Sequence, residues 1–157
     1  MFFDEVDPNG PIFGFQGDYR FLSNFWPAEV VSFQLTFATV EHAYQSGKQQ
    51  MHDAKELFSI KNKLTAGQAK RLGKQLPIRP GWDDFAPTYM RQLVLQKFTK
   101  HADLRKLLLA TGDRHIYELN TWGDTFWGVV QDKHGRLSGF NTLGNILMET
   151  REKVKCL

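Results

Sequence analysis

The sequence predicts a single compact domain of the α+β class, mainly α-helical with a few short strands. Helix caps followed by apolar residues at helical spacing recur through most of the 157 residues, whereas alternating apolar residues occur only in short stretches. The chain is 41% hydrophobic and 24% charged, and it contains no repeat, linker or low-complexity tract. We therefore expect one domain over residues 1–157, long enough to bury one hydrophobic core.

The first half of the chain begins with strands and continues with helices. Residues 12–15 and 29–35 have the composition of short strands. Thr39 is a suitable N-cap for a helix over residues 40–50, and Asp53 is suited to cap a second helix. The apolar residues expected on the inner face of this second helix are Leu57, Ile60 and Leu64.

Further helices follow a predicted capping box. Thr65 and Gln68 have the spacing of such a box, which begins a short helix that stops near Gly73. Helices are then expected over residues 86–99 and 102–110. The inner face of the first of these carries Met90, Leu93, Val94 and Phe98.

The C-terminal part is expected to contain a strand, a loop and a last helix. The strand covers residues 115–119 and the loop covers 120–139, which is rich in Gly and Trp. Asn141 is suited to cap the last helix. The inner face of that helix carries Leu143, Ile146, Leu147 and Val154.

Composition excludes several classes of protein. The single cysteine, Cys156, rules out an internal disulfide framework and a cysteine-based zinc site, and it favours a reducing cytoplasm. The five histidines have no recognisable metal-ligand spacing. We expect no cofactor. No apolar run is long enough to cross a bilayer, and the acidic start of the chain does not resemble a secretory signal. We expect a cytoplasmic protein without a membrane partner.

Positive charge is concentrated in one segment. Residues 48–79 carry a net charge of +6 and the remaining chain carries −3, giving the total of +3. Such a segment suits a phosphate-bearing ligand or a nucleic-acid backbone, although a solvated helix surface gives the same pattern. No Walker loop or dinucleotide glycine motif accompanies it. Its basic residues are Lys48, Lys55, Lys61, Lys63, Lys70, Arg71, Lys74 and Arg79.

Three polar clusters are candidates for the chemistry. Glu41, Gln45 and Lys48 follow one another at helical spacing with Tyr44 adjacent, and the helix start favours the Glu41 anion. A plain exposed helix face is the structural alternative. His42 points about 100° away from Glu41, which favours a packed, hydrogen-bonded histidine.

The other two clusters combine aromatic and polar residues. Residues 120–128 hold Asp124, Trp127 and Gly128, which suit stacking on a base, close backbone approach and contact with sugar hydroxyls; a hydrophobic clasp is the alternative. Residues 21–25 place Ser23 and Asn24 between apolar residues, which also suits a simple polar turn.

Ordered motifs along residues 13–151 resemble the NADAR superfamily, also called the YbiA-like family. The resemblance rests on 21–25 (FLSNF), 39–48 (TVEHAYQSGK), 69–73 (AKRLG), Trp82, Met90, Lys97-Phe98, 107–112 (LLLATG), Glu118, 124–128 (DTFWG) and 139–148 (GFNTLGNILM). The stretch 129–135 (VVQDKHG) differs from some relatives.

The resemblance implies a metal-free N-glycosidase that cleaves the bond between a ribosyl carbon and a nitrogen. By the match of motifs, Glu41 takes the catalytic acidic position and Lys48 the lysine after it. Asp124 is the third catalytic candidate. The predicted substrate-binding residues are Ser23, Asn24, Phe25, Tyr44, Gln45, Trp82, Trp127, Gly128 and Asn141.

Two substrate classes follow from the resemblance, and both are nucleotide-like. One is ADP-ribose attached to guanine, in nucleotides or in DNA, which the basic segment favours. The other is a phosphoribosylated pyrimidine intermediate of riboflavin biosynthesis. A catalytically silent ADP-ribose or nucleotide-binding module and a DNA-binding structural protein are the alternatives outside this enzyme class.

Overall fold

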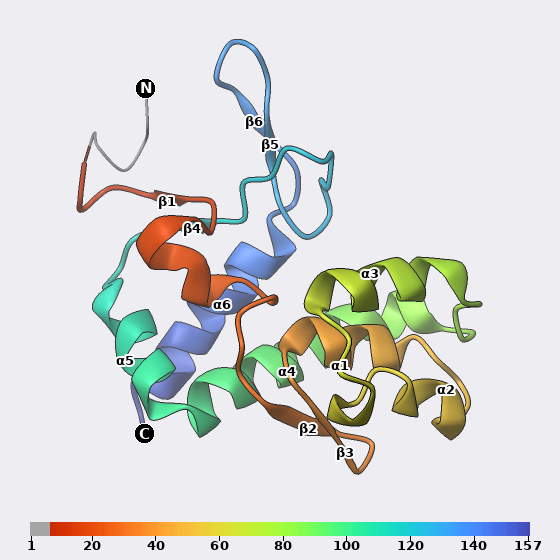
Figure 1. Ribbon diagram of the computed structural model, residues 1–157. Coiled ribbons are helices and arrows are strands. Elements are labelled where there is room, and N and C mark those ends of the chain that lie inside the picture. Colours follow the sequence, from red (N-terminus) through yellow and green to blue (C-terminus); the bar gives the residue numbers. More distant parts are fainter. Residues whose placement is uncertain (1–6) are drawn as a thin grey trace. The chain divides into compact units, whose positions relative to one another are not determined.

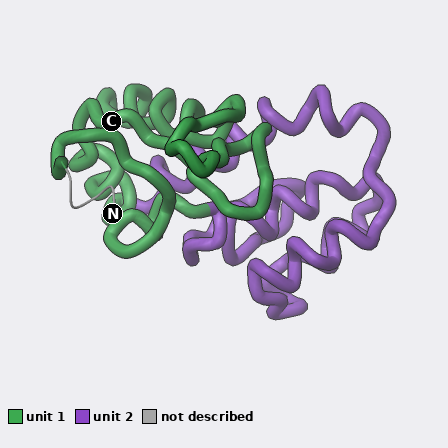
Figure 2. Tube along the Cα trace, turned by 90° about the horizontal axis from the view of Figure 1, so that it is seen from above, with its two compact units in different colours: residues 1–23, 102–157 green, residues 24–101 purple. Residues whose placement is uncertain are grey.

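The computed structural model describes residues 7–157, and their elements fall into two compact units (Figures 1 and 2). One unit contains residues 24–101, and the other contains residues up to 23 together with 102–157. The acidic start of the chain, from which we predict that no secretory signal is present, lies in residues 1–6, outside the described residues. The α+β class, mainly α-helical, is confirmed.

The unit of residues 24–101 is built around helix α1 (Val40–Gly47), which packs against α3 (Ala66–Gln75) and α4 (Trp82–Lys100). The short helices α2 (His52–Glu56) and η3 (Ile60–Asn62) connect α1 to α3. Strands β2 (Val30–Ser32) and β3 (Leu35–Phe37) form an antiparallel hairpin that also contacts α1. The predicted inner face of α4 is confirmed, since Met90, Leu93, Val94 and Phe98 are all buried.

The second unit surrounds helix α6 (Thr142–Val154), which contacts β4 (Ile116–Tyr117) and α5 (Ala102–Ala110). Strand β1 (Ile12–Phe13) pairs in parallel with β4, and η2 (Gly17–Leu22) contacts α5. The strands β5 (Val130–Gln131) and β6 (Leu137–Ser138) form an antiparallel hairpin. The predicted inner face of α6 is confirmed by the burial of Leu143, Ile146, Leu147 and Val154.

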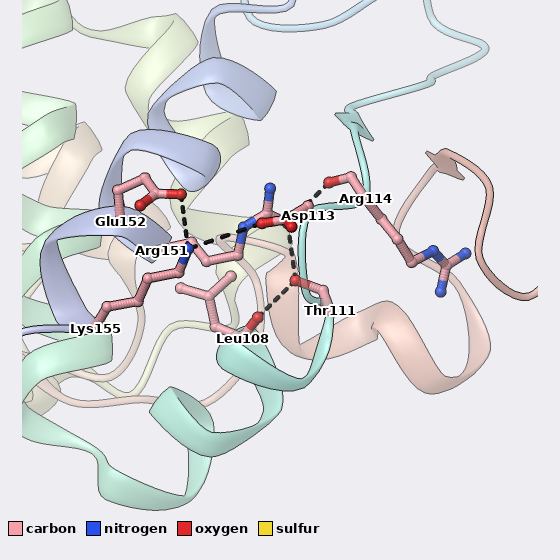
Figure 3. A network of polar contacts seen from close by, with 7 residues as sticks. All are labelled: Leu108, Thr111, Asp113, Arg114, Arg151, Glu152 and Lys155. Atoms are coloured by element: carbon pink, nitrogen blue, oxygen red, sulfur yellow. Dashed lines mark hydrogen bonds and ion pairs between the residues drawn. The ribbon is translucent and has the colours of Figure 1, made fainter.

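A buried arginine ties α6 to the end of α5 (Figure 3). Nη1 of Arg151 donates to Oγ1 of Thr111 at 3.0 Å and to the carbonyl of Arg114 at 2.8 Å. Lys155, one turn further along, forms ion pairs with Glu152 and Asp113. Burial lowers the pKa of Arg151, while Asp113 and Glu152 raise it. This network therefore joins the C-terminal half of α6 to the segment that follows α5.

The single strand expected over residues 29–35 is wrong. The chain turns at Phe33 and Gln34, whose φ angles of 54° and 61° are left-handed, and Ser32 pairs with Leu35 across this two-residue turn. Such turns favour Asn and Gly, so Phe-Gln gives no sequence signal for one. The centroid of the Phe33 ring lies 5.6 Å from that of Tyr89 and 4.5 Å from Nζ of Lys55. These contacts stabilise the turn.

The second helix was predicted too long and with the wrong cap. Helix α2 ends at Glu56, its N-cap is Met51, and Asp53 lies within its first turn. Leu57 and Ile60 are therefore about half exposed rather than packed inward. The predicted stripe fails because the chain leaves the helical path before it forms.

Other helix boundaries were predicted with mixed success. The capping box of Thr65 and Gln68 is confirmed, although α3 runs through Gly73 to Gln75. Helix α4 begins at Trp82 instead of 86, with Asp83 and Asp84 in its first turn, where the helix dipole favours acidic residues. The predicted helix over 40–50 ends earlier, at Gly47, whereas α5 matches its expected range.

The predicted loop over residues 120–139 contains the β5–β6 hairpin. Oδ1 of Asp132 accepts hydrogen bonds from the backbone N–H groups of His134 and Arg136, which shapes the turn between the strands.

Within residues 7–157, no helix combines the length and apolar composition needed to span a membrane.

Candidate active site

Helix α1 begins with a cap that also fixes His42. Oγ1 of Thr39 accepts the backbone N–H of His42 at 3.2 Å and lies 2.7 Å from Nδ1 of the same residue. The other ring nitrogen, Nε2, lies 2.7 Å from the carbonyl of Leu64. A carbonyl only accepts, so Nε2 carries the proton and Nδ1 accepts from the Thr39 hydroxyl. The prediction of a packed, hydrogen-bonded histidine is confirmed.

Glu41 lies in the first turn of α1, and its side chain is buried, with 8% of the residue exposed. Its backbone N–H donates to the backbone carbonyl of Asn24 at 3.1 Å, which fixes Asn24 to the helix start. Nε2 of Gln45, one turn along the helix, donates to Oε2 of Glu41 at 3.0 Å. The backbone of Glu41 is thus fixed by Asn24 and its carboxylate by Gln45.

Burial raises the pKa of Glu41 above its ordinary value. The Gln45 hydrogen bond and the positive charges of Lys70 and Lys48 oppose this effect without cancelling it. The sequence argument that the helix start favours the anion therefore has the wrong sign for the net shift, because desolvation of the carboxylate outweighs it. A carboxylate with a raised pKa beside two lysines is typical of a functional site.

Lys48 follows the last residue of α1 and is half-buried. Its Nζ lies 5.3 Å from the centroid of the Tyr44 ring, and its carbonyl accepts the backbone N–H of Arg79 at 2.8 Å. Burial lowers the pKa of Lys48, and the nearby charges of Lys74 and Lys70 lower it further, while Glu41 raises it. The direction of this pKa shift is the one that a neutral, nucleophilic amine requires.

Aromatic residues line the same unit. Trp82, the first residue of α4, is 4% exposed and contacts Tyr44 at 5.1 Å and Phe85 at 6.1 Å between ring centroids. Phe25 is 42% exposed, with Nζ of Lys70 lying 5.9 Å from its ring centroid. Phe25 therefore presents more aromatic surface to solvent than Trp82 does.

Asn24 has a structural partner of its own. Nδ2 of Asn24 approaches Sδ of Met90 at 3.5 Å, and its carbonyl accepts from Glu41. Seven predicted site residues thus belong to the unit of residues 24–101. They are Asn24, Phe25, Glu41, Tyr44, Gln45, Lys48 and Trp82.

Asp124, in the other unit, organises the loop that follows it. Its Oδ1 accepts the backbone N–H groups of Phe126 at 3.1 Å and Trp127 at 2.9 Å. The side chain of Asn120 bonds to both the backbone N–H and the carbonyl of Asp124. The Trp127 ring meets Phe126 edge to face at 4.9 Å. The catalytic role of Asp124 stays a prediction.

The remaining predicted residues lie in the same unit as Asp124. A Cβ added at Gly128 would lie 2.2 Å from the backbone carbonyl oxygen of Glu118 and 1.8 Å from its Oε2, so only glycine fits against that strand end. Asn141 precedes α6 as predicted, but its side chain does not cap the helix: it accepts from the Glu118 N–H and donates to the Ile116 carbonyl. Ser23 ends η2, with its backbone N–H bonded to the Arg20 carbonyl. Their substrate-binding roles stay predictions.

Two residues outside the predicted set become candidates. Lys70 acts electrostatically on both Glu41 and Lys48, and the sequence signals for it were the basic segment and the 69–73 motif. Glu118 is buried and accepts from Nδ2 of Asn120 at 3.2 Å. In the described part of the chain, no group of three His, Cys, Asp or Glu side chains is arranged to hold a metal ion.

Comparison with known proteins places the chain in a family of enzymes. Residues 12–155 match the NADAR domain, so the chain belongs to the NADAR family. It is an N-glycosyl hydrolase, since relatives that cover most of its length are named N-glycosidases.

The individual relatives are bacterial. The chain is 38% identical to an N-glycosidase of Nostoc punctiforme over 88% of each protein. It is 37% identical to the N-glycosidase YbiA of Escherichia coli K12, over 87% of this chain and 82% of that protein. The NMR structure of E. coli YbiA superposes with a TM-score of 0.75 at 32% identity, covering 93% of this chain and 86% of that one.

One relative carries a different name. The chain is 34% identical to a riboflavin biosynthesis protein of Vibrio vulnificus over 92% of its own length. It spans only 39% of that longer protein.

Proposed function

We propose that this enzyme hydrolyses the bond between a ribosyl carbon and a base nitrogen in a phosphate-bearing nucleotide-like substrate. One observation carries the proposal: the buried Glu41 carboxylate accepts a hydrogen bond from Gln45 and lies within electrostatic reach of Lys48 and Lys70. A carboxylate fixed in this way is suited to a reaction in which positive charge develops beside it.

The chemistry follows from the bond that breaks. As the base leaves, the ribosyl carbon acquires oxocarbenium character, and a nearby carboxylate lowers the energy of that transition state. Gln45 orients Glu41 for this role through its 3.0 Å hydrogen bond. In the proposed reaction, Glu41 acts as the anion that faces the sugar.

Lys48 has two candidate roles. In the first, its neutral amine attacks the ribosyl carbon as the bond to the base nitrogen breaks, and one amine proton passes to the leaving base. The ring carbon–oxygen bond then opens to give an imine, with the second proton passing to the ring oxygen; water hydrolyses the imine to the sugar aldehyde and regenerates the amine. In the second, the protonated side chain holds a substrate phosphate. The lowered pKa of Lys48 supports the first role.

Phosphate recognition is assigned to the basic face of helix α3. Lys70 and Lys74 lie one helical turn apart on α3, and both act on Lys48 at the end of α1. Positive charges from two helices thus meet beside Glu41, and they suit a phosphorylated ribose better than a neutral nucleoside.

The first candidate substrate is ADP-ribose attached to guanine, in a nucleotide or in DNA. Its two phosphates, together with the backbone phosphates when the guanine is part of DNA, suit the basic segment of residues 48–79, whose net charge is +6. The second candidate is a phosphoribosylated pyrimidine of riboflavin biosynthesis, which the name of the V. vulnificus relative favours. Phe25 is proposed to stack on the base because its ring is exposed beside Lys70.

The cytoplasmic location remains a prediction from the cysteine count.

A paired assay tests the proposal. The purified protein is incubated separately with an ADP-ribosylated guanine oligonucleotide and with a phosphoribosylated aminopyrimidine, and the released products are separated by chromatography. We expect turnover of the first substrate. Turnover of the second alone would replace the substrate assignment, whereas tight binding of both without release would favour the non-catalytic module.

A further inference from the structure

The amide of Gln45 makes one hydrogen bond and leaves one buried atom without any. The residue is 3% exposed, and Nε2 donates to Oε2 of Glu41. Among the residues that the structure describes, Oε1 of Gln45 is buried without a hydrogen-bond partner. An unsatisfied buried oxygen is unfavourable, but turning the amide over would place Oε1 against the Glu41 carboxylate, so the hydrogen bond to Glu41 keeps Oε1 in this position.

Gly73 on the neighbouring helix leaves the space that the Gln45 amide occupies. A Cβ added at Gly73 would lie 1.9 Å from Oε1 of Gln45, 2.7 Å from its Cδ and 3.3 Å from its Cγ. Gly73 is buried within α3, which packs against α1. Glycine inside a helix is less favourable than alanine, so its presence here makes room for the Gln45 amide at a cost to α3.

We propose that Gly73 is a positioning residue that acts through Gln45 to aim the amide N–H at the Glu41 carboxylate. The inference rests on the proposed role of Glu41 and deepens it, because it extends the active site to a residue with no side chain. Any side chain at position 73 displaces the amide, and Glu41 loses the hydrogen bond that orients it.

The pH dependence of catalysis reports this chain of contacts. The Gln45 hydrogen bond lowers the pKa of Glu41 against the effect of burial. When the hydrogen bond is lost, the pKa of Glu41 rises further, and the acidic limb of the kcat/KM profile moves to higher pH. A general loss of packing does not produce this directed shift.

The first test compares two glycines in one helix. Gly73→Ala is expected to lower kcat/KM at neutral pH by about tenfold, the effect of losing one hydrogen bond to a charged group. Gly67→Ala is the matched control, because its added Cβ meets only Nη1 of Arg71 at 3.7 Å and Oγ1 of Thr65 at 4.0 Å. The control is expected to retain wild-type activity and an unchanged pH profile.

The second test asks whether Gly73 acts through Gln45. In a Gln45→Ala background the amide is absent, so adding Gly73→Ala is expected to change kcat/KM by less than about twofold. A further large loss in that background would mean that position 73 acts by another route, and it would overturn the proposal.

A third variant covers the case in which Gly73→Ala does not fold. Gln45→Met keeps the length of the side chain and removes the donor, so it is expected to shift the acidic limb to higher pH while Gly73 is intact. An unshifted limb in both Gly73→Ala and Gln45→Met would overturn the proposal. Full activity of Glu41→Gln would contradict the proposed function itself. If Glu41→Gln is inactive but the acidic limbs of Gly73→Ala and Gln45→Met are unshifted, the proposed function stands and only the role of Gly73 is contradicted.

Discussion

Glu41 and Lys48 lie at opposite ends of helix α1, and each changes the pKa of the other. The charge of Lys48 lowers the pKa of Glu41, and the charge of Glu41 raises that of Lys48, but burial has the larger effect on both. Burial thus drives the two groups toward their neutral forms, while their mutual attraction favours the charged pair. The two pKa values are therefore closer together than those of free side chains.

The pH profile of kcat/KM should show this convergence. We expect an acidic limb above the ordinary glutamate value of 4.5, because the active form carries a Glu41 anion with a raised pKa. A second transition is expected below the ordinary lysine value of 10.5. Activity rises through it if Lys48 acts as a neutral amine and falls if Lys48 acts as a cation. A profile flat between pH 4.5 and 10.5 would contradict the assignment of both residues.

Lys48→Arg separates the two roles of the lysine. Arginine keeps the positive charge and binds phosphate, but it stays protonated and forms no imine. We expect this variant to be inactive, and we expect borohydride reduction during turnover to attach the sugar to Lys48 of the wild type, as read by peptide mass. An active arginine variant together with an unlabelled lysine would assign Lys48 to phosphate binding.

Asp124 can be tested with two substitutions that differ in one acceptor. Asp124→Asn keeps an oxygen for the backbone N–H groups of Phe126 and Trp127, whereas Asp124→Ala removes it. We expect the asparagine variant to keep its melting temperature and the alanine variant to lose about 1 kcal/mol of stability. If the asparagine variant is folded but inactive, the charge is catalytic as the sequence predicts; if it is active, Asp124 only positions the loop.

Lys97 is expected to make folding stability increase with pH. Its side chain is 1% exposed, and burial lowers its pKa to about 7. Between that value and the ordinary 10.5, the unfolded chain binds more protons at this residue than the folded one, so the free energy of unfolding rises with pH. The full effect is on the order of 5 kcal/mol.

The matched variant for this measurement is Lys97→Met, which has a similar volume and no titrating group. Urea unfolding of both proteins at pH 7 and pH 9 should show stability rising with pH in the wild type and a smaller rise in the variant. If the free energy of unfolding changes equally with pH in the two proteins, Lys97 does not titrate in this range.

Apart from α2, the helices were predictable because their signals are local. Residues close together in the sequence determine both the capping box of Thr65 and Gln68 and the apolar face of α4. Both features are present in the structure. The β2–β3 turn was not predictable, because Phe33 and Gln34 adopt left-handed backbone conformations that contacts with distant residues stabilise. Turns of this kind depend on tertiary packing rather than on local preference.

The site was predictable in its composition and less so in its electrostatics. Helical spacing correctly placed Gln45 beside Glu41, since the two lie one turn apart. The sign of the Glu41 pKa shift depends on burial by neighbouring elements, which spacing along one helix does not report. The contribution of Lys70 likewise depends on the packing of α3 against α1.

The most direct test of the account is single-turnover base release by Glu41→Gln at saturating substrate. The amide preserves the volume of the side chain and removes the charge that faces the sugar. We predict a rate about 10²–10³-fold below wild type, with substrate affinity within a few fold and an unchanged melting curve. A variant that releases base at the wild-type rate would contradict the central role of the Glu41 carboxylate.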